Sequence, residues 1–185
     1  MAKQRRTITL VLGGARSGKS RWAQEQAAQF SRVTYLATAR AGDREMREKI
    51  ARHRRERPAT WKTVEVSRNL PEAIRSESTS AHVLLIDCFT LYVANVMRTG
   101  KKSDVHNRSR VRELRDAIHS STTSIIAVSN EVGSGIVPAF PSGRVYRDML
   151  GQLNQEVAAI ADTVILMVAG IPLPVKGRLS DRRRV

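Results

Sequence analysis

One eight-residue segment near the N-terminus constrains this chain more than any other. Residues 13–20 read GGARSGKS and match the pattern G-x-x-x-x-G-K-[ST]. The defining positions hold Gly13, Gly18, Lys19 and Ser20. An apolar, β-branched run at 8–12 precedes the segment, and helix-forming residues at 20–30 follow it without a breaker. A glycine-rich turn between a buried strand and a helix is the context in which this pattern binds phosphate, so the segment predicts a phosphate-binding loop (P-loop).

Each part of this loop has an expected task. Backbone N–H groups are expected to surround the phosphate oxygens, and they come from Gly13, Gly14, Ala15, Arg16, Ser17 and Gly18. The positive N-terminal end of the following helix adds to this attraction. Lys19 is expected to neutralise the β- and γ-phosphates, and the Ser20 hydroxyl to bind Mg²⁺.

A P-loop protein also needs an acid at the end of a neighbouring strand, where it orients the water shell of the metal. Asp87 ends the apolar run 83–86 and is expected to bind Mg²⁺ together with Ser20. The alternative is that Asp87 only caps the next helix. The adjacent Cys88 is interpreted as a small buried hydrophobe, because no neighbouring base lowers its pKa.

Strand and helix patterns alternate along the chain. Strands are predicted at 8–12, 33–37, 82–88, 124–129 and 163–168, with a weaker candidate at 64–66. Helices are predicted at 20–30, 43–55, 91–97, 109–120 and 143–161, and a polar surface loop at 98–108. This alternation predicts an α/β protein: a P-loop NTPase fold whose mostly parallel sheet carries helices on both faces, with a RecA-like core.

Length and composition limit the class of protein. A chain of 185 residues with 41% hydrophobic and 26% charged residues is expected to form one domain, here 1–176, followed by a basic tail at 177–185. A single cysteine excludes a disulfide framework and a cysteine zinc cluster. The apolar runs are too short to span a membrane, and the basic N-terminus has no cleavage-type segment. A cytoplasmic protein is therefore expected.

The net charge is +15, from 32 basic and 17 acidic residues. Such a field attracts anions, including nucleotides and nucleic acids. The basic residues are spread over several segments with acidic residues between them, and only 4% of the chain is aromatic. Because stacking on single strands needs aromatic side chains, nucleic acid is not the expected partner.

One histidine stands among arginines in the segment 43–61. His53 is flanked by Arg52, Arg54, Arg55 and Arg57. Neighbouring guanidinium groups favour the neutral, nucleophilic imidazole, and they can bind the phosphates of the group that it attacks. The alternative is a solvated helix whose charged residues include one histidine.

Six segments together resemble a known family. They are GGARSGKSRWAQ (13–24), TYLATA (34–39), DREMREKIARHRRERPATWKTVE (43–65), LLIDCFTLYVAN (84–95), SNEVGSGIVP (129–138) and VAGIPL (168–173). In this order they are similar to the bifunctional adenosylcobinamide kinase / adenosylcobinamide-phosphate guanylyltransferases of cobalamin biosynthesis. The string at 129–138 and the spacing H-R-x-x-R-P-x-x-W are far more specific than a P-loop alone. The segment AFPSG (139–143) and the tail 180–185 are not patterns of that family.

The resemblance implies two successive reactions. ATP or GTP phosphorylates the hydroxyl of the aminopropanol arm of adenosylcobinamide, a corrinoid. A histidine then attacks the α-phosphate of GTP and carries GMP until the corrinoid phosphate accepts it. The resemblance also implies a homotrimer.

Carried over position by position, the resemblance places the GMP-accepting histidine on His53. Nucleotide contacts fall on Ala37, Thr38, Ala39, Arg54, Arg55, Glu56, Arg57, Glu65 and Asp87. Arg54 and Arg57 are suited to clamp phosphate oxygens, and Glu65 to accept hydrogen bonds from the pairing edge of guanine. Asn130 and Glu131 are expected either to contact substrate or to form a turn.

Two other functions remain open on the sequence. A simple P-loop kinase would use Lys19, Ser20 and Asp87 and form no covalent nucleotide. A nucleic-acid-dependent ATPase would show binding that weakens steeply with salt.

Overall fold

The computed structural model describes residues 5–42, 44–55, 57–97 and 104–179, with backbone alone at 45, 46, 49, 52, 53 and 104–107. Within these residues the strands are β1 (Ile8–Gly13), β2 (Val33–Ala37), β3 (Lys62–Glu65), β4 (Val83–Asp87), β5 (Ser124–Val128), β6 (Thr163–Val168) and β7 (Ile171–Lys176). The helices are α1 (Lys19–Ala27), α2 (Arg44–Arg55), α3 (Leu70–Glu77), α4 (Phe89–Met97), α5 (Asp104–Ser120) and α6 (Pro141–Ile160).

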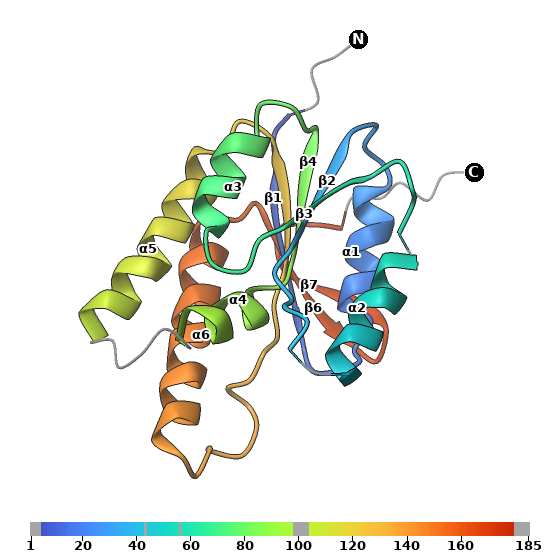
Figure 1. Cartoon of the computed structure of the whole chain (residues 1–185). Helices are drawn as coiled ribbons and strands as arrows, with labels where there is room; N and C mark the ends of the chain where they lie inside the picture. Colours follow the sequence, from blue (N-terminus) through green and yellow to red (C-terminus); the bar gives the residue numbers. More distant parts are fainter. Residues whose placement is uncertain (1–4, 43, 56, 98–103, 180–185) are drawn as a thin grey trace.

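The seven strands form one sheet in the order β3-β2-β4-β5-β1-β6-β7. All neighbouring pairs are parallel except β6 and β7, which are antiparallel. α1 and α2 lie on one side of the sheet, and α3 to α6 cover the other (Figure 1). The strand β5 separates β1, which leads into the P-loop, from β4, which ends in the predicted acid. This architecture confirms the α/β prediction and its RecA-like core.

The central strands are buried on both faces, which is why they read as continuous apolar runs. Because successive side chains of a strand point to opposite faces, β4 contributes Leu84 and Ile86 to one hydrophobic cluster and Val83 and Leu85 to the other. The first cluster packs under α3 to α6, and the second packs under α1. Both faces of the sheet are therefore rigidly supported.

Two elements lie where no element was predicted. Helix α3 is only eight residues long, too short for a clear periodicity, and begins with Pro71 in its first turn. Strand β7 contains Pro172 and Pro174. Proline in a sequence argues against a strand, but it fits an edge strand such as β7, because an edge strand has a neighbouring strand on one side only.

The loop predicted at 98–108 is wrong in its second half, because α5 already begins at Asp104. Its first turns hold weak helix formers, including His106 and Asn107, so intrinsic propensity underestimates the helix. Residues 98–103 and the end of the predicted tail, 180–185, lie outside the described residues. Of the helices described, none is both long and apolar enough to cross a membrane.

Candidate nucleotide-binding site

The predicted P-loop is the turn between β1 and α1. β1 ends at Gly13 and α1 begins at Lys19. Gly18, which caps the helix, has a left-handed backbone with φ of 90°, and Gly13 has φ of 149°. A Cβ atom at Gly13 would lie 2.5 Å from the carbonyl oxygen of Met167, whereas one at Gly14 would meet no atom within 4 Å. The loop therefore requires glycine at 13 for steric reasons and tolerates other residues at 14.

Lys19 is folded back onto the loop that it follows. Its side chain is 7% exposed, and Nζ donates hydrogen bonds to the Gly14 carbonyl oxygen (2.5 Å) and the Ser17 hydroxyl (3.4 Å). The ammonium group is thus held at the N-terminal end of α1, where backbone N–H groups already favour an anion. Together these groups form a site for phosphate oxygens.

Ser20 and Asp87 lie 67 positions apart in the sequence but meet at the carboxyl-terminal end of strand β4. The Ser20 hydroxyl donates to Oδ1 of Asp87 at 3.5 Å. Oδ2 of the same carboxylate accepts a hydrogen bond of 2.7 Å from the hydroxyl of Tyr35. In the parallel pairing of β2 with β4, Ala37 is opposite Asp87, so the carboxyl ends of both strands lie on the same side of the sheet as the P-loop.

Arg57 extends the same cluster. Its guanidinium carbon lies 3.5 Å from the centroid of the Tyr35 ring, a close cation–π contact. Burial, and secondarily the negative charge of Asp87, raise the pKa of Tyr35 far above its ordinary value. Tyr35 is therefore a neutral hydrogen-bond donor. Nε of Arg57 is buried and has no hydrogen-bond acceptor among the described residues, so this guanidinium retains capacity for an anion.

These groups open onto a cleft of about 1710 Å³. Most of the predicted site residues line it: Ala15, Arg16, Ser17, Gly18, Lys19, Ser20, Ala37, Ala39, Arg54, Arg55, Arg57, Glu65 and Asp87. Gly13 and Gly14 belong to the same P-loop but are not among the residues that line the cleft. Thr38 is fully buried and bonds instead with the backbone of Cys88, donating to its carbonyl and accepting from its N–H, each at 2.8 Å.

The lining of the cleft is rich in arginine. It includes Arg54, whose Nη2 lies 3.2 Å from Oε1 of Glu65 in an ion pair that joins the end of α2 to β3. Both side chains are largely exposed, so this pair is readily exchanged for ligand contacts. His53 belongs to α2, next to Arg54, but its side chain and the whole of Glu56 lie outside the described residues.

Several residues of this cleft were not predicted from the sequence. Tyr35 occupies a position of a buried strand where an apolar residue is expected, and no local pattern singles out its hydroxyl. Arg40, Arg47 and Thr90 also line the cleft. Asn130, expected either to contact substrate or to form a turn, lines the cleft as well, and its N–H donates to the Thr90 hydroxyl at 3.0 Å.

Two further side chains near the cleft have structural tasks. Glu131 accepts hydrogen bonds from the N–H groups of Gly133 (2.6 Å) and Ser134 (3.3 Å). Partial burial is the largest single influence and acts to raise the pKa of Glu131, but these hydrogen bonds and the charge of Arg147 together outweigh it, so the pKa is lowered. Burial raises the pKa of Cys88 to about 11, so this thiol is not a thiolate at neutral pH.

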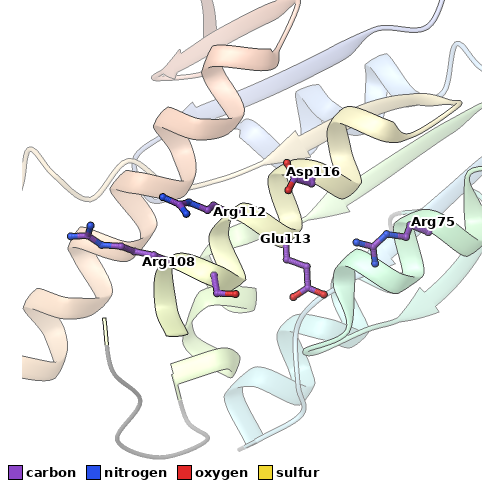
Figure 2. Close-up of a pocket in the computed structure, with 6 residues that line it drawn as sticks. Arg75, Arg108, Arg112, Glu113 and Asp116 are labelled. Carbon is purple, nitrogen blue, oxygen red and sulfur yellow. The ribbon is translucent and has the colours of Figure 1, made fainter. Parts of the chain in front are cut away.

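A second, smaller cavity of about 450 Å³ lies in the other helical layer, between α3 and α5 (Figure 2). Its lining combines three basic residues with two acidic ones and one serine: Arg75, Arg108, Arg112, Glu113, Asp116 and Ser109. Mixed charges of this kind are typical of solvated helix faces. None of the nucleotide-binding motifs contributes to it.

Comparison with solved structures supports the fold. An ATPase of the type III secretion system of pathogenic bacteria matches with a TM-score of 0.53 at 14% identity, over 86% of this chain and 51% of that protein. A structure from Pyrococcus horikoshii, PH0250, matches with a TM-score of 0.54 at 7% identity, over 96% of this chain and 90% of that one. At such identities the likeness concerns the fold alone.

Comparison with characterised families is more specific. Proteins named bifunctional adenosylcobalamin biosynthesis protein are 44% identical in Pseudomonas aeruginosa and 38% identical in Escherichia coli. Both alignments cover 91% of this chain, and they cover 96% and 99% of those proteins. The model of the cobinamide kinase / cobinamide phosphate guanyltransferase family matches residues 9–175, which include the P-loop, Asp87 and the arginine-lined cleft. This chain belongs to the cobinamide kinase / cobinamide phosphate guanyltransferase family.

Proposed function

We propose that this protein phosphorylates adenosylcobinamide with ATP or GTP and then transfers GMP from GTP to the product, giving adenosylcobinamide-GDP. The observation that carries this proposal is the family match over residues 9–175, which contains a P-loop, a strand-end acid and a basic cleft. A cleft of about 1710 Å³ exceeds the size of an ordinary ligand pocket, as two substrates require.

The P-loop performs the first step. Backbone N–H groups and Lys19 hold the β- and γ-phosphates, so that the acceptor hydroxyl attacks the γ-phosphorus while the β–γ bridging oxygen leaves. The negative charge that grows on the leaving oxygens is stabilised by Lys19 and by the N-terminal end of α1. Lys19 is thus expected to act on the rate of transfer more than on binding alone.

The residues present fit Mg²⁺. A hydroxyl and a carboxylate, Ser20 and Asp87, lie 3.5 Å apart at the mouth of the P-loop, and Mg²⁺ prefers such oxygen ligands together with phosphate and water. The described residues contain no group of three or more metal-binding side chains, which fits an ion held largely by substrate and water. The ion would neutralise charge on the phosphates during transfer.

His53 is proposed to perform the second step. A neutral imidazole nitrogen attacks the α-phosphorus of GTP, forming a P–N bond as the bond to pyrophosphate breaks. The phosphate of the corrinoid then attacks the same phosphorus, and the imidazole leaves. Arg54 and Arg57 support this assignment, because both line the cleft and Arg57 retains an unpartnered buried Nε among the described residues.

Labelled GTP tests the proposal. The protein is incubated with Mg²⁺ and GTP labelled in the α-phosphate, without corrinoid, and then denatured. We expect retained label that is acid-labile and alkali-stable, and none with γ-labelled GTP. A folded protein that binds GTP but retains no label would instead be a simple P-loop kinase.

The family resemblance also supports a homotrimer in the cytoplasm. Light scattering is expected to give three times the chain mass of 20.6 kDa.

A further inference from the structure

We propose that Tyr35 is a positioning residue with two roles. Its hydroxyl orients the metal-binding carboxylate of Asp87, and its ring holds Arg57 in the cleft. This inference rests on the proposed function, which places Mg²⁺ at Ser20 and Asp87. It assigns a task to a strand residue that never touches the reacting atoms.

The hydroxyl fixes the orientation of the carboxylate. Asp87 accepts at Oδ2 from Tyr35 (2.7 Å) and at Oδ1 from Ser20 (3.5 Å). The short, charge-assisted bond is the stronger of the two. A hydrogen bond at each oxygen defines the plane of the carboxylate, so its remaining lone pairs keep one direction toward the phosphate-binding loop.

The position of Tyr35 makes this hydroxyl a fixed donor. Tyr35 is 2% exposed and pairs with Leu85 of β4, two residues before Asp87, so all three side chains share one face of the sheet. Its ring packs in the cluster under α1 with Val83 and Ile126. A phenol held this way has little rotational freedom to lose when it donates.

The ring has a second partner. Arg57 lies over its face at 3.5 Å, just beyond the end of α2, the helix to which His53 belongs. One side chain therefore contacts both the carboxylate of the kinase step and an arginine assigned to guanylyl transfer. The guanidinium is held by the aromatic face, and its Nε has no hydrogen-bond acceptor among the described residues, which leaves that N–H for a phosphate oxygen.

The variant Tyr35→Phe removes the hydroxyl but keeps the ring, so it tests the role of the hydroxyl alone. Binding of Mn²⁺, measured by electron paramagnetic resonance with a non-hydrolysable ATP analogue present, is expected to weaken about tenfold. The matched control is Tyr92→Phe, which removes the hydroxyl of an equally buried tyrosine in the other cluster and should leave Mn²⁺ affinity unchanged. Thermal melting checks that both variants are folded.

A double-mutant cycle identifies the route of the effect. Because Tyr35 acts through Asp87, adding Tyr35→Phe to Asp87→Asn should weaken Mn²⁺ binding by less than twofold beyond Asp87→Asn alone. A purely structural tyrosine would give the same factor in both backgrounds. Equal factors, or wild-type Mn²⁺ affinity in folded Tyr35→Phe, would overturn the hydroxyl half of the proposal.

The ring is tested without metal. In EDTA, the affinity for GTP should be unchanged in Tyr35→Phe, which keeps the ring, and several-fold weaker in Tyr35→Leu, which removes it. The variant Arg57→Gln removes the partner of the ring without changing the core, and its affinity for GTP should fall by the same factor. Wild-type affinity in Arg57→Gln overturns the ring half of the proposal. The wild-type protein is assayed for phosphoryl transfer and GMP labelling in parallel, because their absence would reject the proposed function itself, whatever the Mn²⁺ result.

Discussion

Lys19 is the residue on which phosphoryl transfer depends most directly. Its ammonium is already held against the P-loop, 2.5 Å from the Gly14 carbonyl oxygen. We expect Lys19→Ala to lower kcat of the kinase step by about 10² to 10³, the cost of removing one transition-state donor. Lys62→Ala is the matched control, since Lys62 is an exposed lysine of β3 paired with Glu77. Kinase activity near that of wild type in Lys19→Ala would contradict the assignment.

His53 separates the two activities. We expect His53→Ala to abolish GMP labelling, because no other nucleophile replaces the imidazole, and to leave most of the kinase activity. His82→Ala is the control. The His82 side chain forms hydrogen bonds with Ser31 and Arg32, and the residue directly precedes β4, so it lies at the opposite end of the strands from the P-loop. Loss of both activities in folded His53→Ala would contradict this division.

Glu65 is predicted to recognise the guanine base of GTP. A carboxylate can accept from the two N–H donors of the guanine pairing edge, which adenine does not present. We expect Glu65→Gln to reduce the preference for GTP over ATP in the labelling reaction by at least tenfold. Its stability should change by less than about 1 kcal/mol, since the Arg54–Glu65 pair is exposed. Urea unfolding and labelling with each nucleotide test both statements, and unchanged selectivity would remove Glu65 from base recognition.

At the scale of elements, the turn between β1 and α1 distinguishes two adjacent glycines. Gly13→Ala places a methyl group 2.5 Å from a backbone oxygen at a φ of 149°, so we expect nucleotide binding to be lost and the melting temperature to fall. Gly14→Ala meets no atom within 4 Å and should bind nucleotide like wild type. Isothermal calorimetry and thermal melting compare the two. Equal behaviour of the variants would show that the loop rearranges.

At the scale of the molecule, the charge of +15 has a testable consequence. A general attraction for anions is screened by salt, and the chain has few aromatics for stacking. We expect nucleotide turnover at physiological ionic strength to change by less than twofold when duplex DNA or RNA is added. Strong stimulation that persists with salt would favour a nucleic-acid-dependent ATPase instead.

Local patterns of sequence were sufficient for much of the fold. Continuous apolar runs predicted the buried strands of the parallel sheet, because burial on both faces selects apolar side chains at every position. Elements with a weak local signal were missed in whole or in part. Helix α3 has too few turns for a clear period, and β7 contains prolines that only an edge strand tolerates. Helix α5 was predicted only from residue 109, because its first residues are poor helix formers.

The P-loop, the arginine-rich segment around His53 and the family could be predicted from the sequence, because short strings of residues with fixed spacing carry that information. Which distant groups meet depends on the folded chain. Ser20, Tyr35 and Asp87 come from three separate elements: the parallel register of β2 with β4 brings Tyr35 to Asp87, and the turn from β1 into α1 brings Ser20 to the same carboxylate. Alternation along the strand end likewise places Ala37 and Ala39 at the cleft and Thr38 in the core. Hydrogen bonds between elements depend on strand order and register, and no local pattern encodes either of these.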